Sequence, residues 1–461
     1  MTLTVHQAYD RALIREVPTD DEKALEHKLA RAYAAFQDRA KWLKPHERIA
    51  VLEKLAAKVD QKQGELAELI AREGGKPLTD AKIEAARAVD GVRSAIDELR
   101  NFGGHEVPMG LTPASDGRWA FTIREPIGVV AAVSAFNHPL NLIVHQVVPA
   151  IATGCPVLIK PATTTPLSCL AFVALVREAG LPDAWCDTFL PPDSALAEKL
   201  ATDPRVAFLS FIGSARVGWS LRAKLPPGTR CALEHGGAAP AIVDRDVDLD
   251  AVVGPIVKGG YYHAGQVCVS TQRVFVHADV HDAFVEKLTQ KVAALKVGDP
   301  RDAATEVGPL ILPKEVERVA QWVDEAAGAG ARVSTGGKRL GETTYAPTVL
   351  VNPPRDAKVT REEIFGPVTC VYAFRDLTEA IRTANELPLA FQSSVFTKNL
   401  DVALRAAEQL DAATVLINDH TAFRTDWMPF AGRKHSGYGI GGIPYTMHDM
   451  THHKMIVFKR G

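Results

Sequence analysis

The first hundred residues show the hydrophobic spacing of helices that bury one face. Apolar residues recur at three- and four-residue intervals in residues 20–40 and 46–73, which predicts amphipathic helices in both stretches. Glycine and proline in EGGKPLTD, residues 73–80, interrupt this spacing, so we expect a break before a further helix that reaches Leu99. Apolar and polar residues then alternate in residues 118–126, which predicts an extended ribbon.

A different pattern begins at residue 128, where short continuous apolar runs replace the helical spacing. Such runs are typical of strands that are buried on both faces of a sheet. Because helical stretches separate the runs with short connections, we expect an α/β fold with a doubly wound parallel sheet. The predicted strands are residues 128–135, 156–162 and 206–214, and the predicted helices are residues 140–154, 166–182 and 215–225.

A second α/β region is expected further along the chain. Strand-like and helix-like stretches alternate again in residues 239–268, 273–295 and 393–418. The tail HHKMIVFK, residues 452–459, has the pattern of a short strand with no obvious partner in its own domain. We therefore expect this last strand to complete the sheet of a neighbour.

Composition adds limits on the partners of the chain. Its 461 residues are 46% hydrophobic and 23% charged, as in an ordinary globular protein of more than one domain. The formal net charge of −2 offers no basic excess for nucleic acid. No apolar run reaches the roughly 18 residues of a membrane helix, and the N-terminal segment lacks the apolar core of a signal peptide. We expect neither a nucleic acid nor a membrane as partner.

The cysteines and histidines give no sign of a metal site. None of the six cysteines forms a CxxC pair, which favours a reducing, cytoplasmic location over a disulfide framework or a zinc site. The nearest approach to a metal cluster is HDMTHHK, with His448, His452 and His453. No carboxylate or thiolate stands in register with these residues, so we expect a surface or interface histidine cluster and no bound metal.

Two of the predicted strands end in residues that could bind a ligand. Lys160 stands at the carboxyl end of its strand, the edge where α/β sheets bind ligands, and could reach a phosphate or ribose hydroxyl. In FIGSARVG, Gly213 permits a tight turn and Ser214 can cap the next helix, whose free amides suit a phosphate. Both features also occur without a ligand, as a solvated strand end and as an ordinary turn.

Three further residues have side chains suited to covalent chemistry. The amide of Asn137 could donate to a developing oxyanion, although an Asn in a turn before a proline is also common. Glu234 could act as a base, and Gly236 and Gly237 follow it closely in the chain. Alternatively, Glu234 could simply belong to a turn. Cys268 in HAGQVCVSTQR could be a nucleophile, whereas most lone cysteines are inert core residues.

Taken together, these motifs resemble the aldehyde dehydrogenase superfamily, of the NAD(P)-dependent, non-CoA-acylating type, over essentially the whole chain. LEHGGAAP is similar to the glutamate motif of the family, GQVC to its cysteine motif and EEIFGPV, residues 362–368, to a further block. The resemblance implies a homodimer or homotetramer with a doubly wound cofactor domain, a second α/β catalytic domain and a small β oligomerisation element. The domains that it implies are residues 1–107 with 127–236, residues 237–437, and residues 108–126 with 438–461.

The resemblance also implies a role for each candidate residue. Cys268 would attack the aldehyde carbonyl, and its backbone amide would form an oxyanion hole with the side chain of Asn137. Glu234 would activate the water that hydrolyses the resulting thioester. The cofactor, NAD or NADP, would contact Lys160 and Glu363 through ribose hydroxyls, Ser214 beside Gly213 through the pyrophosphate, and Phe365 near the nicotinamide.

Some residues depart from the pattern of the family. Thr163 stands where a Glu is often found, which removes a charge that would repel a 2′-phosphate and allows NADP as well as NAD. His138 replaces a common Phe. Arg424 lies on a loop that the resemblance places beside the substrate funnel, where it could hold a carboxylate, phosphonate or sulfonate. Alternatively, a pair of Arg424 with Asp426 could brace the loop.

We therefore expect oxidation of a small aldehyde to its acid, with a short substrate that is anionic or hydroxylated, such as a lactaldehyde, a semialdehyde or phosphonoacetaldehyde. A CoA-acylating enzyme is the competing prediction, and Glu234 argues against it because such relatives usually lack this residue. Oxidation of aromatic or aliphatic aldehydes is a further alternative. A non-catalytic protein on the same fold would be expected to have lost Cys268, Glu234 or Asn137, and all three are present.

Overall fold

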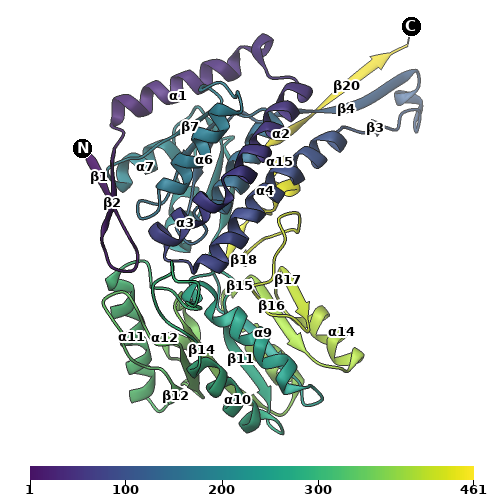
Figure 1. Cartoon of the computed structure of the whole chain (residues 1–461). Coiled ribbons are helices and arrows are strands. Elements are labelled where there is room, and N and C mark those ends of the chain that lie inside the picture. The colour runs from purple at the N-terminus through teal and green to yellow at the C-terminus, as the bar shows by residue number, and fades with distance from the viewer. Residues whose placement is uncertain (461) are drawn as a thin grey trace.

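The computed structural model describes residues 1–460, which form two lobes and a projecting ribbon (Figure 1). The helices expected in the first hundred residues are present, and Asp21 starts the first of them by accepting a hydrogen bond from the backbone N–H of Ala24. Their bounds are α1 (Glu22–Gln37), α2 (Pro45–Gln61), α3 (Gln63–Gly74) and α4 (Leu78–Asn101), with a short 3-10 helix at Arg39–Lys41. A hairpin of β1 (Thr2–His6) and β2 (Leu13–Pro18) precedes them and was not predicted.

The first lobe is built on a six-stranded sheet in the order β19-β9-β8-β5-β6-β7. Its strands run parallel except for β19, which pairs antiparallel with β9. Both faces are buried, because Val130 and Ala132 of β5 pack into one hydrophobic core while Val129 and Ala131 pack into another. The bounds are β5 (Val129–Val133), β6 (Val157–Lys160), β7 (Cys186–Thr188), β8 (Val206–Ile212), β9 (Arg230–Glu234) and β19 (Gly437–Tyr438).

Helices cover both faces of this sheet, which confirms the predicted doubly wound arrangement. The core with Val130 contains residues of α2 to α6 and of a C-terminal helix, α15, whereas the core with Val129 contains residues of α1, α7 and α8. The remaining bounds are α5 (Asn141–Thr153), α6 (Leu167–Glu178), α7 (Ser194–Ala201), α8 (Ala215–Arg222) and α15 (Ile443–Asp449).

The second lobe contains a seven-stranded sheet in the order β12-β13-β14-β11-β10-β16-β17, parallel except for the edge strand β12. Its strands are β10 (Ala239–Val243), β11 (Thr271–His277), β12 (Arg332–Thr335), β13 (Thr348–Val351), β14 (Val368–Phe374), β16 (Gln392–Phe396) and β17 (Thr414–Ile417). Its helices are α9 (Leu249–Tyr261), α10 (His281–Ala293), α11 (Pro313–Gly328), α12 (Lys358–Arg361), α13 (Leu377–Ala384) and α14 (Leu400–Gln409). A small pair of β15 (Leu389–Ala390) and β18 (Arg433–Lys434) lies apart from it.

The ribbon corrects one expectation from the sequence. The C-terminal strand β20 (Thr451–Lys459) has a partner in its own chain, because it pairs antiparallel with the predicted extended segment β4 (Arg118–Pro126) over their full lengths. The short strand β3 (Glu106–Val107) extends this ribbon, with a 3-10 helix at Pro113–Ser115 between β3 and β4. The pattern of either strand did not reveal this pairing, because more than 300 residues separate the two, although the resemblance to the family grouped both segments in one element.

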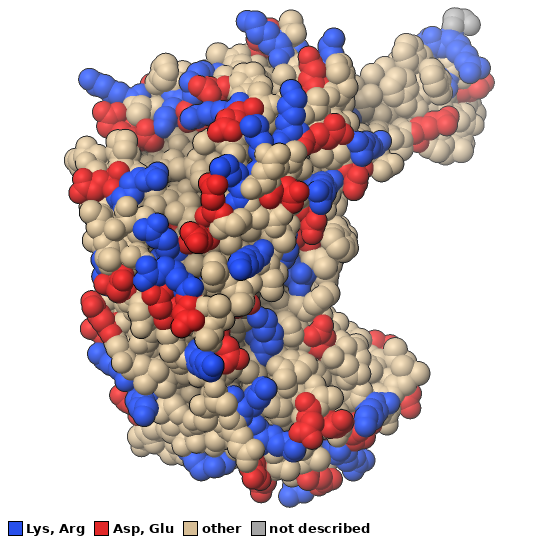
Figure 2. Space-filling view, viewed as in Figure 1, with Lys and Arg blue, Asp and Glu red and all other residues tan. Residues whose placement is uncertain are grey.

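The described residues show no membrane helix and no metal cluster. None of the helices in residues 1–460 is long and apolar enough to span a bilayer. Within the same residues, no three His, Cys, Asp or Glu side chains converge as metal ligands. The three C-terminal histidines are divided between α15 and β20. On the face drawn in Figure 2, basic and acidic side chains are interspersed and no large patch of one sign is visible.

Candidate active site

The two lobes contribute different strand ends to one cavity of about 1290 Å³. Residues of the first lobe that line it follow the carboxyl ends of β5, β6, β8 and β9, while residues of the second lobe precede β11 and β14. Every site residue predicted from the sequence lines this cavity. They are Asn137, His138, Lys160, Thr163, Gly213, Ser214, Glu234, Cys268, Glu363, Phe365 and Arg424. The structure thus brings the residues together, and the role of each stays a prediction.

Cys268 lies in a turn between the 3-10 helix Tyr262–Gly265 and β11. The 3-10 segment before this turn contains His263 and Ala264 in left-handed backbone conformations, with φ of 49° and 54°, which L-residues adopt only where the surrounding structure enforces them. Among the six cysteines, all of which are described and free, Cys268 is the one that is not buried. This exposure toward the cavity argues against a role as a simple core residue.

The electrostatics of the cavity keep the thiol of Cys268 protonated. Its sulfur faces the enclosed cavity and not bulk solvent, so burial raises the pKa of Cys268 to about 12, and the charges of Glu363 and Glu234 act in the same direction. Arg424 opposes them, because its guanidinium stabilises the thiolate. The reactivity of the sulfur therefore depends on the charge states of its neighbours.

Asn137 is tied directly to the turn that carries Cys268. Its side-chain amide is buried and donates to the backbone carbonyl of Gln266 at 2.9 Å. The carboxamide of Gln266 in turn accepts from the backbone N–H of Ile311 at 2.9 Å and donates to the carbonyl of Pro309 at 3.1 Å. Since one N–H of Asn137 is used in this contact, the second remains to donate to a ligand.

Glu234 ends β9, and its backbone is held on two sides. The residue pairs with Gly437 of β19, and its carbonyl accepts from the N–H of Gly213 at 3.0 Å. Burial raises the pKa of Glu234, and Arg424 partly opposes this shift. Gly441 makes room for the carboxyl group, because a Cβ at that position would overlap it. A carboxylate with a raised pKa in a cavity is suited to accept a proton from water.

Glu363 is the second carboxyl group, besides Glu234, whose charge acts on Cys268. Burial raises the pKa of Glu363 to about 8, while the N–H of Gly237 and the charge of Arg318 partly offset the effect. Its Oε1 atom is buried and has no hydrogen-bond partner within residues 1–460. Gly236 is required beside it, because a Cβ there would overlap the carboxyl group. An unsatisfied buried oxygen of this kind fits a ligand that supplies hydroxyl donors.

The remaining cofactor candidates lie along the same edge of the first sheet. Lys160 ends β6, and burial lowers the pKa of its ammonium group. Phe365 packs edge-on against Phe136, with ring centroids 5.8 Å apart. Ser214 corrects a detail of the prediction: it is the N-cap residue of α8, but its side chain accepts no capping hydrogen bond. The first amides of α8 therefore lack a protein side chain as acceptor at this position and remain open to an anion.

Arg424 is held by contacts that leave its charge uncompensated by a bonded carboxylate. Its guanidinium donates to Nδ1 of His145 at 3.2 Å and lies 3.5 Å above the ring of Phe430. Its Nε atom is buried without a partner among the described residues. Burial lowers the pKa of Arg424, and Glu234 opposes that shift. Arg424 thus presents a desolvated cation to the cavity.

The alternative in which Arg424 pairs with Asp426 is wrong as a direct contact. Asp426 is already occupied by Arg87, at 2.7 and 3.1 Å, by Asn141 at 2.9 Å and by His145 at 2.7 Å. Since Nδ1 of His145 accepts from Arg424, its Nε2 carries the proton that is donated to Asp426. The neutral imidazole therefore stands between the two charges, and its pKa is lowered to about 4 by burial and by Arg424.

Sequence reasoning missed two residues that line this part of the cavity and one that contacts Arg424 from behind it. Arg87 on α4 and Tyr262 line it, and Tyr262 places its hydroxyl 3.4 Å from Nε2 of His138. His145 lies inside α5 and was included only in a helical stretch. The periodicity of a helix can indicate that a residue is buried. It does not show that α4, α5 and the loop with Arg424 come together at one point. Only the presence of a polar side chain inside an otherwise apolar stretch could have indicated His145.

The comparison with known families agrees with this geometry. The family model for the aldehyde dehydrogenase family matches residues 1–456. The chain belongs to the aldehyde dehydrogenase family. The prediction of an aldehyde dehydrogenase made from the sequence is thereby confirmed.

Relatives and solved structures of this family match the aldehyde dehydrogenase over almost its whole length. The 3-sulfolactaldehyde dehydrogenase of Priestia megaterium is 38% identical over 429 residues, covering 93% of this chain and 89% of the relative. Aldehyde dehydrogenase 21 from Physcomitrella patens, in complex with the reaction product succinate, has a TM-score of 0.97 at 35% identity and covers 100% and 95% of the two chains. Glyceraldehyde-3-phosphate dehydrogenase GapN from Methanocaldococcus jannaschii, complexed with NADP, has a TM-score of 0.94 at 32% identity and covers 99% of each.

The charges around Cys268 lead to a prediction about its alkylation by iodoacetamide. With a pKa of about 12, the rate should rise about tenfold per pH unit between about pH 6 and pH 9, without a plateau, because only the thiolate reacts. Arg424→Met should slow alkylation, since loss of the cation raises the pKa of the thiol. Glu363→Gln should accelerate it only above about pH 8, where the wild-type carboxyl group is ionised.

The measurement is the rate of modification at Cys268 by peptide mass spectrometry, with Cys268→Ala to identify the reacting thiol. A plateau near neutral pH in the wild type, or faster alkylation of Arg424→Met, would show that the electrostatic account is wrong.

Proposed function

We propose that the protein oxidises a small aldehyde to its carboxylic acid with NAD or NADP, through a covalent intermediate on Cys268. The observation that carries this proposal is the meeting of Cys268, Glu234 and Asn137 in one cavity that continues along the edge of the first sheet. The nucleophile, the base and the oxyanion donor come from two lobes, and each faces the same enclosed space.

Attack by the sulfur of Cys268 on the aldehyde carbonyl forms a thiohemiacetal. The free N–H of the Asn137 amide and the backbone N–H of Cys268 stabilise the oxygen that gains charge. The hydrogen bond from Asn137 to Gln266 fixes the amide relative to the nucleophile, so the donor needs no reorganisation during attack. With a raised thiol pKa, the proton of the sulfur must leave during attack, and the nearby carboxyl groups can accept it.

The residues along the cavity fit a dinucleotide cofactor. The unpartnered Oε1 of Glu363 and the ammonium group of Lys160 suit ribose hydroxyls, and the open amides of α8 suit a pyrophosphate. When bound there, the nicotinamide supplies the oxidising equivalent by accepting a hydride. Thr163 is exposed and carries no charge against a 2′-phosphate, so the proposal includes both NAD and NADP.

Release of the product requires water at the acyl carbon. Glu234 has a raised pKa and acts as the base that removes a proton from this water, which then attacks the thioester on Cys268. A CoA-acylating enzyme would release the acyl group to a thiol and would not need this carboxylate. The presence of Glu234 in the cavity therefore favours hydrolysis.

We further propose that the preferred aldehyde is short and carries an anionic group. Arg424 is a half-buried cation with a buried Nε and no bonded carboxylate, whereas Arg87 beside it is paired with Asp426. A substrate anion would supply the missing partner at low desolvation cost, because the cavity has already removed the guanidinium from bulk water. His138 and Tyr262 add polar atoms beside Asn137 that suit a hydroxyl group on the substrate.

Glu234→Gln tests the covalent mechanism by separating its two halves. A burst of reduced cofactor close to one per active site should remain, because Glu363 can accept the thiol proton in place of Glu234 during attack, while steady turnover falls about 10²-fold or more without the base for hydrolysis. Stopped-flow absorbance of the reduced cofactor measures both phases, and Cys268→Ala, which should give no burst, is the control. If the burst disappears in Glu234→Gln, the carboxyl group acts before oxidation and the assignment is wrong.

Arg424→Met tests the anion site with a panel of aldehydes and both cofactors. For anionic aldehydes, kcat/KM should fall by about 10- to 150-fold, the effect of losing a charge-assisted contact of roughly 1.5–3 kcal/mol. Neutral aldehydes of equal length should lose less, because for them only the raised thiol pKa of the variant slows the reaction. Arg318→Met is a matched control, because Arg318 lines the same cavity but is paired with Glu315 at 2.8 Å. Equal losses for every aldehyde would show that Arg424 does not bind the substrate anion.

The oligomeric state is also a proposal, a homodimer or homotetramer assembled through the ribbon. Trp119 of β4 and Phe458 of β20 are about half exposed, and their rings stack on one face of the ribbon with centroids 5.7 Å apart. The ribbon itself projects from the lobes (Figure 1). Sedimentation should give a mass that is a multiple of the 49.8 kDa chain mass. The Phe458→Lys substitution should lower the mass of the assembly. A wild-type monomer would exclude the proposal. The cytoplasmic location stays a prediction.

A further inference from the structure

Gln272 occupies an irregular point of β11, four residues after Cys268. The pairing of β10 with β11 aligns Ala239 with Thr271 and Pro240 with Arg273, so Gln272 is the extra residue of a bulge. Bulges redirect side chains and are common beside active sites. Gln272 is only 4% exposed, and a buried carboxamide needs hydrogen-bond partners.

Two of the three partners of Gln272 are the residues on either side of Glu363, and the third is in the preceding helix α12. Its Nε2 donates to the carbonyl of Glu362 at 2.8 Å and to the carbonyl of Val359 at 3.0 Å. Its Oε1 accepts from the backbone N–H of Ile364 at 2.9 Å. The carboxamide therefore binds the backbone on both sides of Glu363 while making no contact with the Glu363 side chain.

The segment around Glu363 has few other restraints. It connects the one-turn helix α12 to β14 without regular structure, and Phe365 adopts a left-handed conformation with φ of 48°. Such a conformation persists only where neighbouring groups hold it. The Glu363 carboxyl group itself has an unpartnered Oε1, so its direction depends on how its backbone is held.

We infer that Gln272 is a positioning residue that aims the Glu363 carboxyl group at the cofactor. This inference rests on the proposed function, in which Glu363 binds ribose hydroxyls. Through this bulge, strand β11, which follows Cys268 in the chain, directly contacts the segment that carries Glu363. A single short stretch of chain thereby sets both the position of the sulfur and the position of Glu363.

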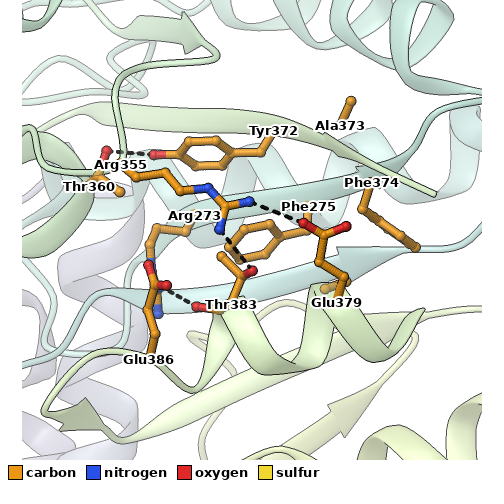
Figure 3. A pocket seen from close by; sticks show the side chains of 11 residues that line it. Arg273, Phe275, Arg355, Thr360, Tyr372, Ala373, Phe374, Glu379, Thr383 and Glu386 are labelled. Atoms are coloured by element: carbon orange, nitrogen blue, oxygen red, sulfur yellow. Dashed lines mark hydrogen bonds and ion pairs between the residues drawn. The ribbon is translucent and has the colours of Figure 1, made fainter. Parts of the chain in front are cut away.

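The neighbouring residue Arg273 holds the opposing wall of the same region. Its buried guanidinium donates to the carbonyl of Ala238 at 3.0 Å and to that of Ala384 at 2.9 Å. Ala238 follows Gly236 and Gly237, which lie against Glu363. Beside Arg273 is a pocket of about 20 Å³, lined also by Tyr372 and Thr383 (Figure 3), which has room for about one water molecule and not for a second substrate.

Gln272→Met removes the three hydrogen bonds and keeps the length of the side chain. The dissociation constants of NAD and NADP, measured by fluorescence titration without aldehyde, should rise roughly tenfold, as expected when a charge-assisted contact is weakened. Hydrogen exchange of the peptide that contains Ile364 should accelerate, because its amide loses its acceptor. Gln392→Met is the matched control, since Gln392 is buried in the same sheet but its carboxamide has no partner among residues 1–460.

A double-mutant cycle distinguishes positioning from a general loss of structure. If Gln272 acts through Glu363, Gln272→Met should have no further effect on the dissociation constants in the Glu363→Gln background. Additive effects, or unchanged exchange at Ile364, would overturn the inference. Should Gln272→Met fail to fold, Gln272→Asn keeps a carboxamide that is too short for all three contacts and should weaken cofactor binding in the same direction.

The proposed function can fail separately from this inference. If Glu363→Gln alone leaves cofactor binding unchanged, Glu363 does not bind the cofactor, and the role of Gln272 toward it is overturned as well. If Glu363→Gln weakens binding but Gln272→Met does not, the cofactor site stands and only the positioning role is excluded.

Discussion

Desolvation of charge around Cys268 is the constraint on which the rest of the site depends. The sulfur shares an enclosed cavity with Glu234 and Glu363, and burial raises the pKa of all three groups. Arg424 is the nearby cation that opposes these shifts at Cys268 and Glu234. The same guanidinium is available to a substrate anion, so its charge connects the reactivity of the sulfur with the choice of aldehyde.

The same constraint explains the polar network behind Arg424. A guanidinium in this position would be costly without partners, yet a bonded carboxylate would neutralise it. The neutral imidazole of His145 meets both requirements. It accepts a hydrogen bond from Arg424 and donates one to Asp426, and it adds no charge of its own. Arg87 then balances Asp426, and the free cation remains on the cavity side.

Periodicity and strand order were sufficient to predict the α/β architecture and the residues at strand ends. Asn137, Lys160 and Ser214 lie at or just after the ends of predicted strands of one parallel sheet, so a local pattern and the common edge of the sheet predict that they converge. The strand β9, which ends in Glu234, was not predicted, and only the resemblance to the family indicated the place of this residue. The structure places all four residues in one cavity as expected. Cys268 and Glu363 come from turns before strands, where only resemblance to a family indicated their place.

The features that were missed depend on contacts between distant segments. Asp80, Glu84 and Arg87 on α4 have the spacing of a solvated charged face, but Glu84 is buried with Lys76 and caps α5 at the N–H groups of Leu140 and Asn141. The strands of the hairpin β1–β2 are only five and six residues long, so their pattern was too short to distinguish the hairpin from a loop. The sequence of neither β4 nor β20 alone indicates that the two strands pair with each other.

The C-terminal position of β19 and α15 has a consequence for the order in which the chain folds. These elements complete the sheet edge beside Glu234 and the core around α4 and α5, although they are synthesised after the second lobe. The N-terminal lobe therefore cannot reach its final structure on the ribosome while the second lobe is being made, despite the general tendency of domains to fold in order of synthesis. Until then the nascent first lobe has an open sheet edge and an uncovered apolar face, and the active site is assembled only after β19 and α15 have been synthesised.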